Sequence, residues 1–573
     1  LAMTKIQAQE MVQPNIVAGA AADAGAADAA FGLNPLVGFG SADLVAALHQ
    51  IAAQVMKNPW SLAEQQTALA SKLAHTWLGG TGLEPAPGDK RFADPTWSND
   101  PFYRGLKQAY LAWVEAMEAW IDRAGFDQRS EPRVRMLLSL LLDAAAPTNT
   151  WLGNPAAIRK FVETGGASAL RGLTHMLEDM AGNGGLPAQV DRKAFRVGEN
   201  LGILPGAVVF KNDVLELIQY APRTEQVHRR PLLIVPPQIN KFYLFDLAPG
   251  RSLIEFLTAN GLQTFTLSWR NPTPAHRDWG LERYLGAMLE AIEAIREITG
   301  SEDINVAAAC SGGITTSLLL GHLAAHGDRR IHAATLLVAV LDTSAESQLA
   351  NFTSREGIEM ARHGSCQKGV LEGQELARVF AWMRPNDLIW NYWVNNYLLG
   401  NDPPAFDILY WNSDTTRLPA ALHSDYLDFY LNNPLPRPSA LRLLGTPIDL
   451  GKVACDTFVL AGMTDHITPW QACYATTRML GGQKEFVLSS SGHIQSIINP
   501  PGNPRAKFFR NPQLAADPTA WLAAAQPQPG SWWDYWRDWL VARSGEQKPA
   551  PATLGSRLHK PGVKAPGAYV FEP

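Results

Sequence analysis

Apolar residues recur with two different spacings along this chain, and each spacing predicts a different kind of element. In the first part they repeat every three to four positions, as at Leu44 and Leu48, which predicts amphipathic helices. Asn154 followed by Pro155 is a further helix-start signal, because Asn can cap a helix and Pro suits its first turn. We therefore expect a mostly helical N-terminal domain over residues 36–195.

From about residue 196 onward, short apolar runs rich in β-branched residues alternate with helical patterns. Such alternation favours a mainly parallel sheet with right-handed crossovers, which is an α/β fold. One helix is predicted at residues 252–260, where Gly261 closes it, and a longer one at 281–300. The strands are predicted at residues 207–210, 215–220, 231–237, 264–269, 304–309, 334–342, 458–465 and 484–493.

A long segment interrupts this alternation between Asp342 and about Thr457. It is rich in aromatic residues, including the stretch FAWMRPNDLIWNYWVNNYLLG at 380–400, and it is too long to be a simple loop. Because it is inserted between two strands, it should lie over the carboxyl ends of the strands, where open α/β sheets bind ligands. We predict a catalytic domain over residues 196–573 with a cap insertion at about 343–457.

Composition excludes several classes of function. The net charge of −5 and the lack of long Lys or Arg runs argue against a nucleic-acid partner. The four cysteines are scattered without CxxC spacing, so neither a metal site nor a disulfide framework is expected. These features favour a reducing compartment.

We expect no targeting signal in the first residues of the given sequence. Residues 1–35 are rich in Ala and Gly with little periodicity, so we expect them to be disordered. They lack a basic stretch followed by an apolar core, and no apolar run reaches the roughly 18 to 20 residues needed to cross a bilayer. We expect a cytoplasmic protein without a transmembrane segment.

The stretch INVAAACSGGITTSLLLGHL at residues 304–323 places Cys310 between a buried strand and a helix start. Gly312 and Gly313 should let the backbone turn sharply and let the following helix pack closely. A thiol at such a turn stands above the sheet edge, and the helix N-terminus behind it favours the reactive thiolate. We interpret Cys310 as a nucleophile on a sharp strand-to-helix turn, although a lone Cys is more commonly just buried.

Asp465 and His493 follow two later strands, which gives the order nucleophile, acid, histidine. This is the order found in the α/β-hydrolase family, and it predicts that all three side chains meet at one sheet edge. His493 would take the proton of the Cys310 thiol, and Asp465 would orient His493 and stabilise its charged form.

Other residues near these strand ends compete for roles or complete the site. His466 is a rival base, but it adjoins Asp465 and should point in a different direction. The donors to a developing oxyanion should be the backbone amide of Ser311 and one amide from the loop after residue 237, at Gln238 or Ile239. His322, on the helix after Cys310, is expected to be a packing or surface residue.

The segment AACSGG around Cys310 resembles the lipase-like box of polyhydroxyalkanoate synthases, whose usual form is GxCxGG. The similarity runs from about residue 90 to the end through RFADPTW, PPQINKFY, SWRNP, FDILYWN, TPIDL, AGMTDHITPW and SGHIQSIINPPGNP. Ala308 departs from the box, and it fits only if that residue has no positive φ. The cap and C-terminal segments most resemble the single-subunit pseudomonad type, class II.

The resemblance implies an α/β-hydrolase fold and the polymerisation of medium-chain (R)-3-hydroxyacyl-CoA into polyhydroxyalkanoate, with release of CoA. Cys310, Asp465 and His493 match the family's catalytic residues position by position. The resemblance also implies a homodimer, a growing polyester chain and a granule surface as partners, and no cofactor beyond the coenzyme A that the substrate carries. Ile494 and Gln495 would border the acyl pocket, or would simply begin the next helix.

Three alternatives stay open at this point. The chain could be a short-chain, class I synthase, or a Cys-dependent acyl-CoA thioesterase or hydrolase of the same fold. It could also be a granule-associated structural protein without catalysis. That last alternative would use the segment GSWWDYWRDWLVARSG, in which Trp532, Trp536 and Trp539 fall on one helical stripe that either packs against the core or faces a partner.

Overall fold

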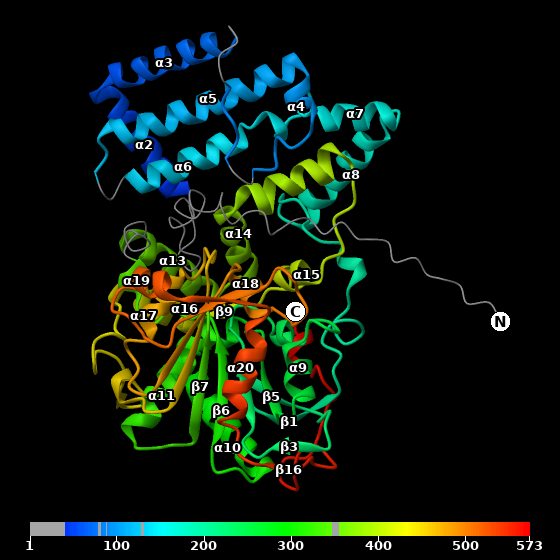
Figure 1. Cartoon of the computed structure of the whole chain (residues 1–573), viewed down its shortest axis with the longest axis vertical. Helices are drawn as coiled ribbons and strands as arrows, with labels where there is room; N and C mark the ends of the chain where they lie inside the picture. Colours follow the sequence, from blue (N-terminus) through cyan, green and yellow to red (C-terminus); the bar gives the residue numbers. More distant parts are fainter. Residues whose placement is uncertain (1–40, 78–81, 87–88, 128–130, 347–354) are drawn as a thin grey trace, which may run out of the picture. The chain divides into compact units, whose positions relative to one another are not determined.

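The computed structural model describes residues 41–573 apart from 78–81, 87–88, 128–130 and 347–354 (Figure 1). The disorder predicted for residues 1–35 therefore lies outside the described residues. The chain divides into two compact units. One contains the described parts of Ala46–Met176 together with Trp393–Asn401, and the other contains Leu177–Tyr392 and Asp402–Pro573 with the described residues before Ala46.

Helices predominate in the described residues from Ser41 to Gly182, as the spacing of apolar residues predicts. Asn154 caps α7 as expected, because its side chain accepts hydrogen bonds from the amides of Ala156 and Ala157. Phe92, Trp97 and Tyr110 form part of one buried cluster in this region. The helices are α2 (Ser41–Lys57), α3 (Pro59–Trp77), α4 (Thr96–Asn99), α5 (Pro101–Ala124), α6 (Glu131–Ala144), α7 (Pro155–Glu163) and α8 (Ala167–Gly182).

A ten-stranded sheet forms the centre of the second unit within the described residues. Its order is β1-β2-β5-β4-β6-β7-β12-β13-β14-β15, and the six strands from β5 to β13 run parallel. The predicted α/β class is correct. The strands are β1 (Gly206–Lys211), β2 (Leu215–Tyr220), β4 (Leu232–Val235), β5 (Thr264–Trp269), β6 (Ile304–Ala309), β7 (Ile331–Leu337), β12 (Asp456–Gly462), β13 (Lys484–Ser489), β14 (Lys507–Arg510) and β15 (Gln526–Pro529).

Some strand bounds differ from the sequence expectations. The strand predicted at 334–342 is β7 (Ile331–Leu337), because the chain leaves the sheet at Val338, whose φ is 46°. The prediction also missed β14 and β15, which extend the sheet in antiparallel fashion. Their short sequences, KFFR and QPQP, have little apolar alternation, so pattern reading had no signal for them.

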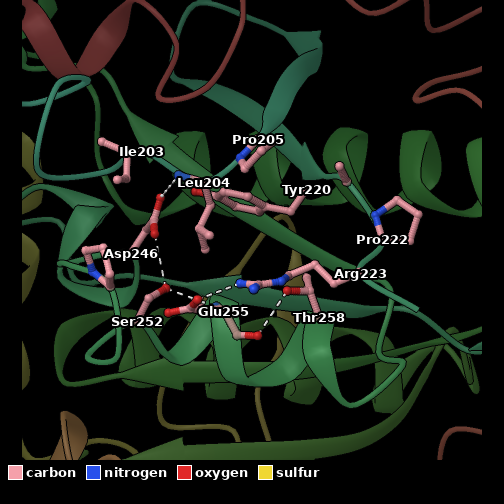
Figure 2. Close-up of a pocket in the computed structure, with 12 residues that line it drawn as sticks. Ile203, Leu204, Pro205, Tyr220, Pro222, Arg223, Asp246, Ser252, Glu255 and Thr258 are labelled. Carbon is pink, nitrogen blue, oxygen red and sulfur yellow. Dashed lines mark hydrogen bonds and ion pairs between the residues drawn. The ribbon is translucent and has the colours of Figure 1, made fainter. Parts of the chain in front are cut away.

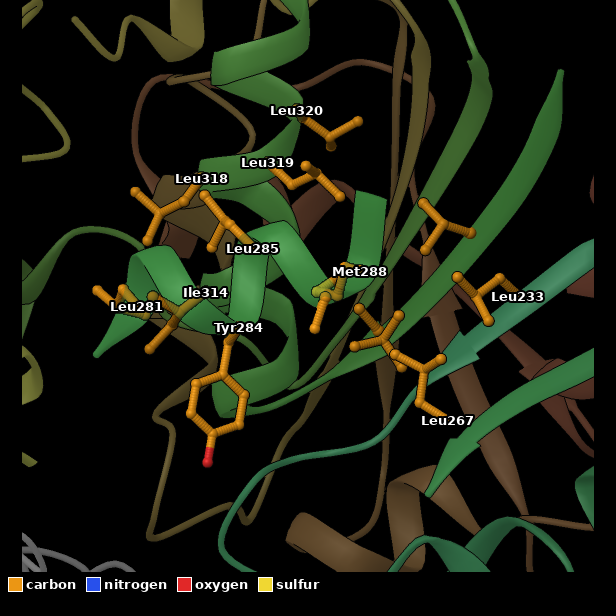
Figure 3. Packing of buried hydrophobic residues seen from close by; sticks show 14 of the residues in the cluster. Leu233, Leu267, Leu281, Tyr284, Leu285, Met288, Ile314, Leu318, Leu319 and Leu320 are labelled. Carbon is orange, nitrogen blue, oxygen red and sulfur yellow. The ribbon is translucent and has the colours of Figure 1, made fainter. Parts of the chain in front are cut away.

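Two long helices cover one face of the sheet. They are α10 (Leu281–Thr299) and α11 (Ser311–Ala325), and their apolar side chains pack against strand residues such as Leu233 and Leu267 (Figure 3). The residues of α11 from Ser311 to Gly321 are buried. The helix behind Cys310 is therefore held firmly by the core on all sides.

The opposite face is covered by α9 (Leu253–Ala259) and α20 (Trp532–Val541), which lie in front of the sheet in Figure 1. Trp532 and Trp536 on α20 are completely buried, and the indole nitrogen of Trp536 donates to Thr335 on β7 at 2.9 Å. Trp539 packs on the same cluster. The stripe of tryptophans thus faces the core, which confirms the packing alternative over a partner-facing surface.

The segment between β7 and β12 has its own helices and, in its described residues, a short hairpin of β10 and β11 and a second short strand pair of β8 and β9. The structure assigns Trp393–Asn401 to the helical unit and the rest to the α/β unit. Within the α/β unit, Thr415 forms a bridge with Asn240, just after the carboxyl end of β4. The elements are α13 (Arg355–Lys368), β8 (Val370–Leu371), α14 (Gly373–Met383), π-helices Asn386–Trp390 and Trp393–Leu398, α15 (Asp407–Ser413), β9 (Leu418–Pro419), α16 (Ala420–Asn432), β10 (Arg442–Leu443) and β11 (Thr446–Pro447).

The smaller elements complete the second unit. Short strands β3 (Gln226–His228) and β16 (Gln547–Pro549) pair away from the main sheet. Helices α17 (Trp470–Thr476), α18 (His493–Ile497) and α19 (Pro518–Ala524) lie among the last strands. None of the helices in the described residues is both long and apolar enough to cross a membrane.

Candidate active site

Cys310 lies at the turn between β6 and α11, with φ 50° and ψ −122°. A positive φ is rare for a residue with a side chain, so the backbone is strained at the predicted nucleophile. The Cys310 amide donates to the carbonyl of Leu337 at 2.9 Å, and its carbonyl accepts from the amide of Gly313 at 2.9 Å. These bonds hold the strained turn in place and leave the thiol half-buried at the sheet edge.

Gly312 and Gly313 allow close approach and do not provide the sharp turn expected of them. Neither has a positive φ, and the turn is made by Cys310 itself. A Cβ on Gly312 would lie 2.6 Å from the carbonyl oxygen of Pro236, and a Cβ on Gly313 would lie 2.5 Å from the Cβ of Ala339. Ala308 lies in β6, where it pairs with Val235 of β4, and its φ is not positive. Its departure from the usual box therefore does not disturb the turn.

Asp465 and His493 meet at the carboxyl ends of the neighbouring parallel strands β12 and β13. Asp465 lies three residues beyond the end of β12, and His493 is the first residue of α18. Nδ1 of His493 donates to Oδ2 of Asp465 at 2.6 Å, and both residues are buried. The two side chains that the order of residues predicted to meet do so, through the nitrogen that leaves Nε2 free to face another group.

Thr468 also contacts this pair, which the sequence reasoning missed. Its hydroxyl donates to Oδ2 of Asp465 at 2.7 Å and lies 3.2 Å from Nδ1 of His493. Oδ1 of Asp465 accepts from the amides of Ile467 and Thr468 at 2.8 and 3.0 Å. The carboxylate therefore accepts four hydrogen bonds. The spacing Asp-x-x-Thr, which is typical of turns closed by a carboxylate, was a usable signal.

Electrostatics favour the charged forms of both members of the pair. Burial by itself lowers the pKa of His493, but Asp465 and, after it, the sulfur of Cys310 outweigh burial, and the pKa is raised to about 10. Burial opposes ionisation of Asp465, yet the charge of His493 and the hydrogen bonds keep the pKa of that carboxyl lowered. The sulfur of Cys310 is thus among the groups that raise the pKa of His493, which links the three residues electrostatically.

The C-terminal helix α20 supports the helix that carries His493. The indole nitrogens of Trp532 and Trp533 donate to the carbonyls of Ser496 and Ile497 at 2.6 and 3.0 Å. These carbonyls lie at the end of α18, where no further turn of helix can satisfy them. Two buried tryptophans, nearly forty residues further along the chain, therefore fix the position of the proposed base.

The other two histidines considered from the sequence do not join this unit. The structure gives His466 no hydrogen bond to Asp465, and its Nδ1 has no hydrogen-bond partner among the described residues. Burial and the nearby charge of Arg384 lower the pKa of His466 to about 3. His322 packs against His326 on α11, with ring centroids 4.8 Å apart. His493 is thus the histidine that the structure pairs with Asp465.

The loop after β4 lies on the other side of Cys310. The backbone amide of Gln238 donates to the hydroxyl of Ser311 at 3.2 Å, so that amide is already engaged. The carbonyl of Ile239 accepts from the amide of Thr416 at 3.4 Å. The Ile239 amide is the next amide along this loop after that of Gln238. Ser311 is the first residue of α11, where backbone amides have no partner within the helix.

Ile494 and Gln495 lie in α18 directly after His493, and both are half-buried. The next helix therefore does begin at these residues, as one of the two alternatives held. Their place at an acyl pocket stays a prediction.

A cavity of about 440 Å³ lies elsewhere, beside α9, and its lining includes none of Cys310, Asp465 and His493 (Figure 2). Burial raises the pKa of Asp246 in its wall to about 7, although the amide of Leu204 and the hydroxyl of Ser252 both donate to that carboxyl. Arg223 reaches Glu255 at 2.7 Å. Most of the polar groups here bond to one another. The cavity is separate from the candidate active site, because none of the three residues of that site lines it.

The fold and the arrangement around Cys310 define a class of protein before any relative is considered. Parallel strands with covering helices, a strained nucleophile turn after β6 and an acid and a histidine after two later strands are the features of the α/β-hydrolase fold. A family model described as "alpha/beta hydrolase fold" matches residues 231–500. The second unit therefore has this fold.

The wider comparison identifies the family. A model described as "Poly-beta-hydroxybutyrate polymerase (PhaC) N-terminus" matches residues 88–257. Poly(3-hydroxyalkanoate) polymerase 1 of Ectopseudomonas oleovorans is 52% identical over 547 residues, which cover 96% of this chain and 98% of that protein. Polymerase 2 of the same organism is 52% identical over 94% of this chain and 96% of its own length. The chain belongs to the poly(3-hydroxyalkanoate) polymerase family.

Among solved structures, a hydrolase from Pseudomonas aeruginosa PA01 is similar to 51% of this chain and 92% of its own length, at 14% sequence identity. The TM-score of 0.31 is too low to add to the assignment. The family therefore rests on the sequence relatives and the family model.

Proposed function

We propose that this protein polymerises (R)-3-hydroxyacyl-CoA into polyhydroxyalkanoate with release of CoA, through an acyl group bound to Cys310. The observation that carries the proposal is the unit of Cys310, His493 and Asp465 in a chain of the polymerase family. A thiol, a base and an acid in this order are the components of acyl transfer by a covalent intermediate.

In the first step, the sulfur of Cys310 attacks the carbonyl carbon of the acyl-CoA thioester. A new C–S bond forms, the bond to the CoA sulfur breaks, and the acyl group stays on Cys310. His493 holds the proton of the Cys310 thiol and returns it to the departing CoA thiolate. Asp465 keeps Nδ1 of His493 occupied at 2.6 Å, so that Nε2 is the nitrogen that exchanges the proton.

In the second step, the 3-hydroxyl of another unit attacks the thioester at Cys310. His493 takes the hydroxyl proton and passes it to the Cys310 sulfur as the ester forms. One ester bond is made for each thioester broken. Exchange between two thioesters is nearly isoenergetic, so a Cys nucleophile keeps the acyl group activated for transfer to an alcohol. This is a chemical reason for a thiol at this turn.

The negative oxygen that develops in both steps needs hydrogen-bond donors. The backbone amides of Ser311 and Ile239 fill this role in the proposal. The Gln238 amide, which the sequence left as an alternative, is engaged by the Ser311 hydroxyl, and this supports Ile239. Donors fixed before the reaction stabilise such a charge without reorganisation.

The family relationship supports the proposed substrate and setting. We propose medium-chain acyl groups, supported by 52% identity to two polymerases of Ectopseudomonas oleovorans. We further propose a homodimer in the cytoplasm, bound to the surface of its own polyester granules. The coenzyme A arrives with the substrate, so no separate cofactor takes part.

The test compares the purified chain with Cys310→Ala on (R)-3-hydroxydecanoyl-CoA. We expect CoA release with insoluble polymer from the parent chain, and no CoA release from the variant. CoA release with free acid in place of polymer would establish a thioesterase. Equal CoA release by parent and variant would refute the role of Cys310. No CoA release by either chain would refute the proposed activity and would favour a purely structural granule protein.

Chain-length preference has a separate test. The rate of CoA release from a C10 substrate should exceed that from a C4 substrate by about tenfold, since each buried methylene contributes about 0.8 kcal/mol and the gain is only partly expressed in the transition state. A faster reaction with the C4 substrate would assign the chain to the short-chain type. Light scattering with and without substrate checks the homodimer.

A further inference from the structure

Gln238 uses every polar group it has on the protein around it. Its backbone amide donates to the Ser311 hydroxyl at 3.2 Å, and its side-chain amide nitrogen donates to the Thr315 hydroxyl at 2.9 Å. Its side-chain oxygen accepts from the hydroxyl of Tyr426 at 3.0 Å, and its carbonyl accepts from the hydroxyl of Thr416 at 2.7 Å. The residue is only 2% exposed. A buried residue with four satisfied polar groups has one fixed orientation.

The four partners come from two parts of the fold. Ser311 and Thr315 lie on the first turns of α11, directly after Cys310. Thr416 and Tyr426 belong to the segment inserted between β7 and β12, with Tyr426 on α16. Gln238 therefore joins the helix behind the nucleophile to the inserted segment, through side chains that pattern reading could not bring together.

The same loop is also fixed on either side of Gln238. The Ile239 carbonyl accepts from the Thr416 amide at 3.4 Å, and Asn240 forms a bridge with Thr415. On the other side, Gly312 approaches the carbonyl of Pro236 so closely that a Cβ would lie 2.6 Å away. The Ile239 amide thus sits in a loop that is held by α11 from one direction and by the inserted segment from the other.

The orientation of the network is set by its hydroxyl groups. The Thr315 hydroxyl donates to the Ser311 carbonyl at 3.1 Å, so it is left to accept from Gln238. Burial raises the pKa of Tyr426, although its contacts with Thr315 and Ser311 act in the opposite direction, so the phenol stays neutral and donates. This fixes which end of the Gln238 amide faces each partner.

We propose that Gln238 is a positioning residue that holds the Ile239 amide in place for the oxyanion and makes this placement depend on the inserted segment. The inference rests on the proposed acyl transfer at Cys310. Gln238 itself does not touch the reacting atoms. It acts by keeping the donor loop at a fixed distance from the nucleophile turn.

The test exploits two reactions of the same thiol. Acyl transfer from (R)-3-hydroxydecanoyl-CoA develops an oxyanion, whereas alkylation of Cys310 by iodoacetamide displaces iodide at a saturated carbon and develops none. Gln238→Met keeps the volume of the side chain but removes its bonds to Thr315 and Tyr426. We expect kcat for CoA release to fall by about 10- to 100-fold, because misplacing a donor costs up to what removing it costs. The KM and the alkylation rate should stay within about twofold, since neither depends on that charge.

Tyr426→Phe provides a milder variant with the same signature. It removes the bond to the Gln238 side-chain oxygen and the weaker 3.5 Å contact with the Thr315 hydroxyl. The side-chain nitrogen of Gln238 keeps its bond to Thr315, so kcat should fall by about three- to tenfold with unchanged alkylation. Combined with Gln238→Met, it should add little further loss, because both changes break one shared bond. Simple additivity of the two losses in kcat would count against the shared network.

Gln263→Met is the matched control. Gln263 is also a buried glutamine, and its side chain donates to the carbonyl of His228, just before the start of β4 and away from Cys310. We expect kcat and alkylation to stay at the parent values, with only a lower melting temperature.

The outcomes separate the inference from the proposed function. If the parent chain released no CoA, the proposed function would fail. If the parent were active and Gln238→Met and Tyr426→Phe both kept kcat within about twofold, the positioning role would be overturned. A parallel fall in acyl transfer and alkylation would also overturn it, because the damage would then lie in the thiol and its base. Should Gln238→Met fail to fold, Tyr426→Phe still decides the question.

Discussion

The two sides of Cys310 are built from different chemistry. On one side, Asp465 and His493 form a buried, charged pair on the loops that follow β12 and β13. On the other side, Gln238 and Tyr426 form a neutral network between the loop after β4 and the inserted segment. The charged side is made by the segments that directly follow β12 and β13, whereas the neutral side also needs residues of the inserted segment.

This difference matches the two tasks of acyl transfer. Moving a proton needs groups whose charge changes, and such groups are costly to bury unless they are paired. Stabilising an oxyanion needs donors that do not move and do not titrate. The charged side therefore controls the reactivity of the thiol itself, and the neutral side controls only reactions that pass through an oxyanion.

The largest expected effect is the loss of the base. His493→Ala should lower the rate of CoA release by at least about 10⁴-fold, because removing the base of a nucleophile–base pair costs this much in related chemistry. Alkylation of Cys310 by iodoacetamide should also slow, in contrast to its constancy in Gln238→Met. Both rates are measured on the same preparations.

His466→Ala is the control for this change, since His466 adjoins Asp465 but has no hydrogen bond to it in the structure. We expect CoA release within about threefold of the parent, as a residue that takes no part in the transition state should leave its free energy nearly unchanged. If His466→Ala lost more activity than His493→Ala, the role of base would pass to His466. The pair of Asp465 and His493 would then not be the charged side of the site.

The charged side was largely predictable from the sequence, and the reason is local. Cys310 stands between an apolar run and small residues, and Asp465 and His493 follow two apolar runs, so the strand pattern alone places them at one edge. The box also showed that Ala308 needs an ordinary φ, which the structure gives it. One detail was wrong: the strain falls on Cys310 and not on the glycines.

The neutral side could not be predicted, because its bonds connect residues that are far apart in the chain. Tyr426 lies 188 positions from Gln238, and nothing in the spacing of either residue marks the pair. The same limit hid β14 and β15, whose pairing depends on tertiary contacts rather than on apolar alternation. The assignment of Trp393–Asn401 to the helical unit likewise has no local signal.

A change of pH should act on the charged side alone. The folded pKa of His493 is about 10 against an ordinary value of 6.5, so folding favours its protonated form. This contribution is fully present below about pH 6.5 and is lost as the pH rises toward 10. The pKa of Asp465 is lowered from 3.8, so its contribution is present above that value and is lost in more acidic solution.

The measurement is the free energy of unfolding of the parent and of His493→Gln, by urea titration, at several pH values. The parent's advantage should be greatest between about pH 4 and 6.5 and should shrink steadily up to pH 10. Gln238→Met should show a difference from the parent that does not change across this range, because its network contains no group that titrates there. An advantage that grew with rising pH would contradict the charged pair.

The smallest expected effect comes from Thr468, whose hydroxyl donates to Oδ2 of Asp465 at 2.7 Å. Thr468→Val keeps the shape of the side chain but leaves the carboxylate with one donor fewer, which should raise the proton affinity of Asp465 and loosen its alignment with His493. We expect CoA release to slow by about three- to tenfold, since a hydrogen bond to a charged group contributes about 1.5 to 3 kcal/mol and only part of it is lost at the transition state.

Thr468→Ser restores the hydroxyl and should recover most of the rate. Because the change is on the charged side, alkylation should slow together with acyl transfer. If Thr468→Val slowed acyl transfer alone, Thr468 would behave like Gln238, and the division between the two sides of Cys310 would not hold.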